Sequence, residues 1–299
     1  MPSTVDIPLA RTDRRALQLI TASGRNPLDP FVDVDWTVSI DDSAYHLPAH
    51  WLPLYATPAW EAMSEPARIA YSRHECAALC GAGIWFENML MQVVLQHLTT
   101  IPVTSPAHRY LLIEVADECR HSTMFGEFIR RAGTPAYAPP ADTPTIDTLG
   151  GVPGAQALGY VLILAVEEIL DATNRATMKD PSIHSVSRQM AKLHVLEEAR
   201  HVSFAKTYLT EAWPGLTTEE RAAVVGIAPH AVANVAGLMV NDAVYAELGI
   251  VGGAAVARAN PHHQARVIEG LAKLVDFLAG LGVINDDTRP AWKDLGLIA

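Results

Sequence analysis

Two short segments of the chain each carry a glutamate followed three residues later by a histidine, with an arginine between them. Glu118 and His121 lie in "DECRHSTMF", and Glu198 and His201 lie in "EEARHVSF", well separated along the chain. Side chains three or four residues apart share a face of an α-helix, so each segment presents a carboxylate and an imidazole together. His194, four residues before Glu198, extends the second segment into a stripe of three. This mixture of ligand types suits non-haem iron or manganese.

A helical bundle that binds two metal ions takes Glu-x-x-His from two helices and one inward glutamate from each of the other two. Two further apolar segments supply such glutamates: "GAGIWFENMLMQVV" contains Glu87, and "VLILAVEEILDA" contains Glu167 and Glu168. An ionised carboxylate in apolar surroundings is costly unless it is paired or metal-bound. The residues therefore predict a dinuclear site with the ligands Glu87, Glu118, His121, Glu167 or Glu168, His194, Glu198 and His201.

Other charged residues near these segments have weaker claims to a role. Arg120 and Arg200 cannot be ligands, and we expect each to pair with an acid on a neighbouring helix. Asp117 and Asp171 are candidates to accept hydrogen bonds from ligand histidines, or they are acids on the helix surface. Glu114 shares its side of the helix with Glu118, so we expect it beside the site or paired with an arginine.

Four long helices must position these residues, and the sequence predicts them at about 65–98, 106–132, 155–179 and 182–213. Ser64 and Ser105 are good N-caps, and a proline follows each within the first turn. Gly133 and Pro181 mark helix ends. No segment shows the alternation expected of a strand. The predicted fold is all-α, a ferritin-like four-helix bundle core with additional packed helices.

The same patterns predict one domain over residues 1–299. Residues 1–57 are expected to form an extended arm with one short helix at most, and 64–213 the metal-binding bundle. Residues 217–282 are expected to form additional helices, beginning at the capping box of Thr217 and Glu220. Breaks are predicted near Pro229, Gly249 to Gly253 and Asn260-Pro261, and an irregular tail follows.

Composition limits the classes of partner and compartment. The chain has 299 residues, of which 49% are hydrophobic, and a net charge of −11. An acidic chain of this kind argues against nucleic acid as a partner. Three cysteines and no secretory signal pattern favour a cytoplasmic protein, with Cys76 and Cys80 as buried thiols. No segment has the ~20 unbroken apolar residues of a membrane span, so no membrane partner is expected.

The ordered series Glu…Glu-x-x-His…Glu…His-x-x-x-Glu-x-x-His resembles the p-aminobenzoate N-oxygenase family of non-haem di-iron oxygenases, in the ferritin-like superfamily. The approach to the first ligand helix, "LYATPAWEAMSEPARIAYSRHE", is also similar, and the resemblance covers roughly residues 52–208. It implies Glu167 as a ligand in place of Glu168, because its spacing to His194 fits the family better. The implied ligand set is Glu87, Glu118, His121, Glu167, His194, Glu198 and His201.

The resemblance also implies a reaction. Two iron ions would use O2 and external electrons to oxidise an amine, above all an arylamine, to a hydroxylamine, nitroso or nitro product. A separate reductase or reductant would supply the electrons, because the sequence has no Gly-rich dinucleotide loop after a strand. A homodimer is expected, and the ligand types also suit manganese. Arg266 and Lys273 are candidate cations for a substrate carboxylate, or they are charges on the solvent-facing side of a helix.

Other functions fit the same residues. A di-iron hydroxylase or an acyl desaturase is one alternative, because soluble acyl-carrier-protein desaturases also carry two Glu-x-Arg-His segments; His194 as a third histidine favours the N-oxygenase. A non-catalytic ferritin-like iron-binding protein is another, although the helices after Trp213 exceed what a storage subunit needs. A purely structural helical protein would bind no stoichiometric metal.

Overall fold

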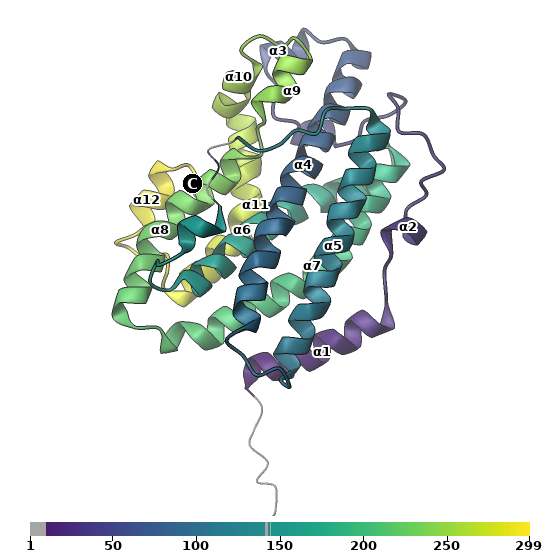
Figure 1. Ribbon diagram of the computed structural model, residues 1–299. Helices are drawn as coiled ribbons and strands as arrows, with labels where there is room; N and C mark the ends of the chain where they lie inside the picture. Colours follow the sequence, from purple (N-terminus) through teal and green to yellow (C-terminus); the bar gives the residue numbers. More distant parts are fainter. Residues whose placement is uncertain (1–9, 141–142, 144) are drawn as a thin grey trace, which may run out of the picture.

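The four predicted long helices form the centre of the molecule (Figure 1). The computed structural model describes residues 10–140, 143 and 145–299. Its bundle consists of α4 (Glu65–Leu98), α5 (Pro106–Ala132), α6 (Ala155–Lys179) and α7 (Ser185–Ala212). Within the described residues there is no strand, only an isolated bridge between Tyr45 and Ile183. The all-α, ferritin-like prediction is confirmed.

Local capping explains where the bundle helices begin and end. The side chain of Ser64 accepts a hydrogen bond from Ala67 N at the start of α4, and Ser105 accepts one from His108 N at the start of α5. Gly133 ends α5 in the left-handed region, with φ of 64°. A glycine adopts that conformation without steric cost. These boundaries agree with the sequence prediction because the signals that set them are local.

The prediction of at most one short helix within residues 1–57 is wrong, because the chain forms the 15-residue helix α1 (Arg11–Arg25); residues 1–9 lie outside the described part. The N-terminus of α1 is capped by Glu211 of α7, which accepts hydrogen bonds from Arg11 N at 2.9 Å and Thr12 N at 2.8 Å. Helix α1 packs on α5 and α7, and Figure 1 shows it crossing α5 at the lower end of the bundle. Because this cap comes from another helix, no local sequence motif in residues 1–57 predicts it.

Short helical turns link the larger elements. Before the bundle these are α2 (Pro30–Asp33), η1 (Ala49–Trp51) and α3 (Pro58–Glu61). The turns η2 (Ile146–Leu149) and η3 (Trp213–Gly215) follow α5 and α7.

The additional helices after the bundle cover α6. Helix α8 (Thr218–Gly237) begins at the predicted capping box, and it packs on α6 together with α11 (Pro261–Leu281). The break predicted at Pro229 is wrong, because α8 runs through it. The proline ring removes one backbone hydrogen bond from α8. Burial of the apolar stripe of Val224, Ala228 and Val232 offsets that loss.

The remaining breaks fall as predicted. Helix α9 (Asp242–Glu247) is separated from α10 (Gly253–Ala259) by the glycine-containing turn, and Asn260 caps α11. The tail is not wholly irregular, because α12 (Arg289–Asp294) forms within it. Its Trp292 is fully buried, so packing rather than helix propensity orders this segment.

Two apolar clusters fill the interior and leave a polar layer between them. In α5, Tyr110 and Leu111 belong to the cluster that also contacts α8 and α11, whereas Met124 and Phe125 belong to the other. The buried α5 side chains between those positions are acidic or histidine. Predicted ligand residues therefore occupy one level of the bundle, with apolar packing above and below.

By length and composition, two segments are apolar enough to cross a membrane, which differs from the expectation that none would be. They are Glu65–Leu98 and Thr218–Glu247, with 50% and 44% of their most apolar windows buried within the protein. Core helices pass the same test, and α4 carries the buried acids Glu75 and Glu87. The packing of both segments against other helices favours core helices.

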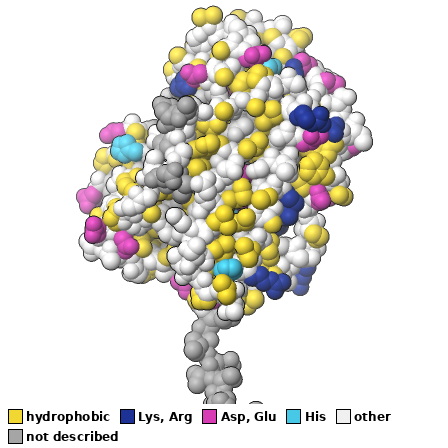
Figure 2. Space-filling view, in the orientation of Figure 1, with side chains coloured by type: hydrophobic (Ala, Val, Ile, Leu, Met, Phe, Trp, Pro, Cys, Tyr) yellow, Lys and Arg dark blue, Asp and Glu magenta, His cyan; other side chains and the backbone are white. Residues whose placement is uncertain are grey.

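Hydrophobic side chains also reach the surface along the face formed by α4 and α5 (Figure 2). Leu95 on α4 and Leu112 on α5 are 49% and 48% exposed. The homodimer expected from the sequence stays a prediction.

Candidate metal centre

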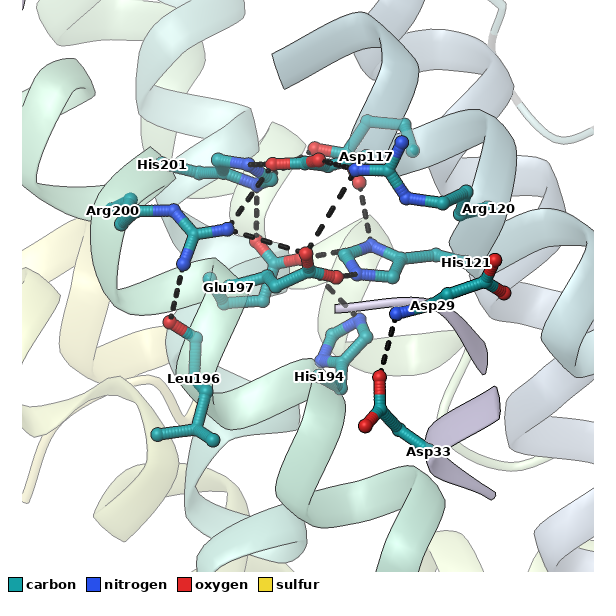
Figure 3. A network of polar contacts seen from close by, with 12 residues as sticks. Asp29, Asp33, Asp117, Arg120, His121, His194, Leu196, Glu197, Arg200 and His201 are labelled. Carbon is teal, nitrogen blue, oxygen red and sulfur yellow. Dashed lines mark hydrogen bonds and ion pairs between the residues drawn. The ribbon is translucent and has the colours of Figure 1, made fainter. Parts of the chain in front are cut away.

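All seven predicted ligand residues come together in the polar layer of the bundle. Each is at most 2% exposed, and each of the four bundle helices contributes at least one. Figure 3 shows His121, His194 and His201 directed into the same region between the helices. The seven residues are Glu87 on α4, Glu118 and His121 on α5, Glu167 on α6, and His194, Glu198 and His201 on α7.

Six of the seven form two overlapping groups that could each hold a metal ion. Glu87, His121, His194 and Glu198 make one group, in which one ligand atom from each residue lies within 4.8 Å of the others. The second group consists of Glu118, Glu198 and His201 under the same distance limit. Glu198 belongs to both groups, and a carboxylate in that position can bridge two cations.

Each histidine turns one ring nitrogen toward the carboxylates. Nδ1 of His121 lies 2.8 Å from Glu118 Oε2 and 3.1 Å from Glu198 Oε1. Nδ1 of His201 lies 2.8 Å from Glu118 Oε1 and 2.9 Å from Glu198 Oε2. Nε2 of His194 is 3.6 Å from both Glu87 Oε1 and Glu198 Oε1. These last separations are beyond hydrogen-bond distance.

The other nitrogen of His121 and of His201 contacts an acid from the opposite helix. Nε2 of His121 lies 2.8 Å from Glu197 on α7, and Nε2 of His201 lies 3.3 Å from Asp117 on α5. Each Glu-x-Arg-His segment therefore supplies an acid to the histidine of the other. Asp117 takes the histidine-bonding role suggested for it, whereas Asp171 contacts Arg175 and Lys273 instead.

Sequence reasoning missed Glu197 and Asn174. Glu197 occupies the position in the second segment that Asp117 occupies in the first, so the repeat itself carried the signal. Asn174 on α6 lies 3.2 Å from Nδ1 of His194 through its side-chain amide. If His194 Nε2 is to offer a lone pair to a metal, the ring proton must be on Nδ1. Asn174 then accepts this proton through its side-chain oxygen, an orientation that a flip of the amide group provides. Nothing in the spacing of Asn174 pointed to this contact.

Both arginines of the repeat are ion-paired across the helices, as expected. Arg200 lies 3.3 Å from Asp117 and 3.2 Å from Glu197. Arg120 pairs closely with Asp117 and lies 3.9 Å from Glu197 (Figure 3). The two acids are thus held between cations while each accepts from a histidine, which fixes the orientation of both imidazole rings.

The structure separates the two adjacent glutamates of α6. Glu168 points to cations: its Oε1 lies 2.5 Å from Lys206 Nζ and its Oε2 3.7 Å from Lys273 Nζ. Glu167 points the other way, and its Oε2 has no hydrogen-bond partner among the described residues. Its carboxyl group interacts with those of Glu198 and Glu87. This arrangement agrees with the choice of Glu167 as the candidate ligand.

Burial and mutual repulsion dominate the electrostatics of the outer carboxyl groups. Burial raises the pKa of Glu87 well above its ordinary value, and the nearby charge of Glu118 raises it further. Burial likewise raises the pKa of Glu167, with Glu198 as the next contributor. Glu114 also lies beside the site, and burial raises its pKa to about 8.

The central pair of carboxylates behaves differently because the histidines face it. Burial opposes ionisation of Glu118 and Glu198, but the charge of His201 and hydrogen bonds from the histidines outweigh it and lower both pKa values. Burial lowers the pKa of His194 to about 4, which keeps its ring neutral. A neutral imidazole is the form that binds a metal.

The donor set fits two divalent cations. Four carboxyl groups and three imidazoles converge in a buried space, and such groups are costly to bury unpaired. Glu167 Oε2 and His194 Nε2 are both buried without a hydrogen-bond partner in the described part of the chain, and both face the cluster. Oxygen and imidazole nitrogen donors of this kind suit iron or manganese.

A family model described as p-aminobenzoate N-oxygenase AurF matches residues 10–282 of the chain. The chain belongs to the AurF family. AurF-family proteins are di-iron oxygenases, so the resemblance drawn from the ligand series is confirmed. The match extends beyond residues 52–208 to include α1 and the helices from α8 to α11, so these elements also belong to the AurF-family fold.

Relatives of this AurF-family chain occur in mycobacteria. The uncharacterized proteins Rv0885 of Mycobacterium tuberculosis and Mb0909 of Mycobacterium bovis are each 32% identical to it over 214 residues. The matched region covers 68% of this chain and 62% of each relative. The chain thus spans just under two thirds of the length of the curated relatives it matches.

Proposed function

We propose that this protein is a di-iron N-oxygenase that oxidises an amine with O2 and external electrons. The observation that carries the proposal is the buried cluster of four glutamates and three histidines, contributed by four helices of an AurF-family chain. Two iron ions held there would supply the activation of O2. The protein's own part is to orient the ligands and to keep water away.

Each proposed ligand has a defined task. Glu198, which belongs to both ligand groups, and Glu118 beside it would hold the ions at the centre of the cluster. His121 and His201 would bind through Nδ1, and His194 through Nε2. Glu87 and Glu167 would complete the two coordination shells from α4 and α6.

An organic substrate is favoured over iron storage by a cavity of about 360 Å³ that is lined in part by Glu167. A storage protein has no need of such a cavity, whereas an oxygenase must bring its substrate next to the metal ligands. A separate reductant would deliver the electrons, and we expect the protein to act as a homodimer in the cytoplasm.

Adjacent glutamates provide a sharp test of the metal site. The Glu167→Ala variant should bind no more than one iron per chain after anaerobic reconstitution, whereas the wild type should bind two. The matched Glu168→Ala variant should retain two, because Glu168 pairs with Lys206. Iron is measured by a colorimetric chelator assay, with circular dichroism to check folding. Two irons per chain in both folded variants would exclude Glu167 as a ligand.

Activity is tested on the iron-loaded protein. With a chemical reductant and a panel of arylamines, O2 consumption should rise with amine and an N-oxygenated product should appear by mass spectrometry. Uptake of iron far beyond two ions per chain, with no amine-dependent O2 consumption, would instead support a storage protein.

A further inference from the structure

A large cavity lies next to the candidate metal centre. It has a volume of about 360 Å³ and is enclosed by α4, α6, α8 and the segment around η2. Its lining includes Glu167, the glutamate whose carboxyl group faces the cluster. At α8 the cavity reaches the surface, where Ile227 is 37% exposed and His230 and Asn234 are also exposed. A molecule in it would lie between solvent and the metal ligands.

The wall of the cavity is overwhelmingly apolar. Helix α4 contributes Trp85, Phe86 and Met89, and α6 contributes Leu162 and Val166. Glu167 has the only carboxyl group among the described lining residues. Neutral polar groups are confined to threonines near η2 and to the His230 and Asn234 side chains at the mouth. Such a wall favours the burial of apolar surface.

Among the residues that the structure describes, neither lysine nor arginine reaches the cavity. Arg266, one cation considered for a substrate carboxylate, lies over the Trp51 ring, pairs with Glu269 and lines a different, much smaller cavity. Lys273, the other one, pairs with Asp171 and Glu168. The undescribed residues include no lysine or arginine. A carboxylate buried in this cavity would therefore lack a lysine or arginine partner, which is costly.

The volume also exceeds that of one aromatic ring. An apolar cavity of about 150 Å³ is large enough to hold benzene. The cavity in this protein has a volume of about 360 Å³. It therefore provides space for two aromatic rings or for one ring with an alkyl group. The polar mouth allows one hydrogen-bonding group at the end that faces water.

We infer, on the basis of the proposed function, that the substrate is an uncharged and largely apolar amine larger than one ring, and not an aminobenzoate. The amine enters the cavity with its nitrogen toward Glu167, and its far end lies at His230 and Asn234. These two residues, one helical turn apart on α8, determine what the far end of the substrate carries.

Two probes that differ in one carboxylate test this inference: 4-aminobiphenyl and 4'-aminobiphenyl-4-carboxylate. Isothermal titration calorimetry on the iron-loaded protein under anaerobic conditions should give at least tenfold tighter binding of the neutral probe. Equal or tighter binding of the carboxylate by the wild type would overturn the inference.

Variants on α8 locate the binding. Ala231→Trp places a large ring in the cavity and should weaken binding of the neutral probe at least tenfold, while the matched Ala222→Trp, on the same helix but outside the cavity lining, should not. Asn234→Arg adds a cation at the exposed mouth and should reduce the preference for the neutral probe at least threefold. No effect of Ala231→Trp on binding would place the site elsewhere and overturn the inference.

The same samples separate this inference from the proposed function. Tight binding of the neutral probe that is lost in Ala231→Trp supports the cavity as the substrate site. If the iron-loaded protein binds this probe but does not oxidise it, the result counts against the N-oxygenase proposal alone. Preferred oxidation of p-aminobenzoate over 4-aminobiphenyl would support an N-oxygenase and overturn the inferred substrate class.

Discussion

At the scale of single residues, the centre is built from a short repeat, acid-Glu-x-Arg-His, that occurs on α5 and α7. The sequence predicted the ligand-type residues because a fixed spacing on a helix places side chains on one face. It did not predict that the first acid of each copy contacts the histidine of the other, since that exchange depends on how α5 and α7 face each other. Asn174 was beyond prediction for the same reason.

Glu197 is expected to strengthen metal binding without touching the metal. Its carboxylate accepts from His121 Nε2 and pairs with Arg200, so it orients the ring and raises its basicity. Glu197→Ala should lower iron affinity about 10- to 100-fold, and Glu197→Gln, which keeps an acceptor, should lower it less. Competition with a chelator under anaerobic conditions measures the affinity. Asp171→Ala is the control, because that buried acid pairs with Arg175 and Lys273 instead; equal losses in all variants would contradict the role.

Asn174 is expected to set the tautomer of His194. Asn174→Leu removes the acceptor for the Nδ1 proton of His194. The tautomer with its proton on Nε2, which cannot bind the metal through that atom, is then more populated, and iron affinity should fall about tenfold. Asn174→Asp keeps an acceptor and should remain within about threefold of the wild type. The same chelator competition measures both. Wild-type affinity in Asn174→Leu would show that the contact does not matter.

Glu75 is expected to make folding stability depend on pH. It is 2% exposed, and burial raises its pKa from 4.5 to about 7 despite hydrogen bonds with Tyr71 and Tyr245. Between these values the folded protein binds the proton that the unfolded chain releases, so stability falls as pH rises. The free energy of unfolding has fallen by about 3 kcal/mol once the pH is above 7 and both states have lost the proton.

A glutamine at this position removes the titration. The advantage of Glu75→Gln over the wild type should therefore grow by up to about 3 kcal/mol between pH 5 and 8, as measured by urea unfolding at equal metal loading. Glu219→Gln, at an exposed position, is the matched control. A constant difference for Glu75→Gln would rule out the raised pKa.

At the scale of elements, helices with local caps were predictable and helices with distant caps were not. The boundaries of α4, α5 and α6 follow from Ser64, Ser105 and the glycines and prolines between them. Helix α1 escaped prediction because Glu211 caps it from α7, and α8 continued through Pro229 because tertiary packing outweighs one lost hydrogen bond.

Removal of the distant cap should loosen α1. Glu211→Ala should destabilise the protein by about 1 kcal/mol, because two backbone N–H groups of α1 lose their acceptor. Urea unfolding measures the loss of stability. In the variant, amide hydrogen exchange should speed up relative to the wild type more in residues 11–25 than in α4. Asp286→Ala, an exposed acid in a loop, is the control. Unchanged exchange in residues 11–25 would mean that α1 is held by its apolar contacts alone.

At the scale of the whole molecule, the bundle and the added helices divide the work. The bundle encloses the polar layer with the candidate ligands, whereas α8 closes an apolar cavity against α4 and α6. Sequence patterns predicted the bundle, but not the cavity, because its wall combines helices that are far apart in the chain. The contacts of the two candidate substrate cations were not predictable for the same reason, because their positions on α11 do not indicate which residues they face.

One measurement tests the central claim most directly. Protein loaded anaerobically with two irons per chain is mixed with 4-aminobiphenyl, reductant and 18O2 for a single turnover, and the product is analysed by mass spectrometry. The account predicts that 18O is attached to the amine nitrogen in the wild type, and that Glu167→Ala gives no labelled product. Two results would contradict the account: recovery of the amine without any 18O from fully loaded wild-type protein, or 18O attached to carbon instead of nitrogen.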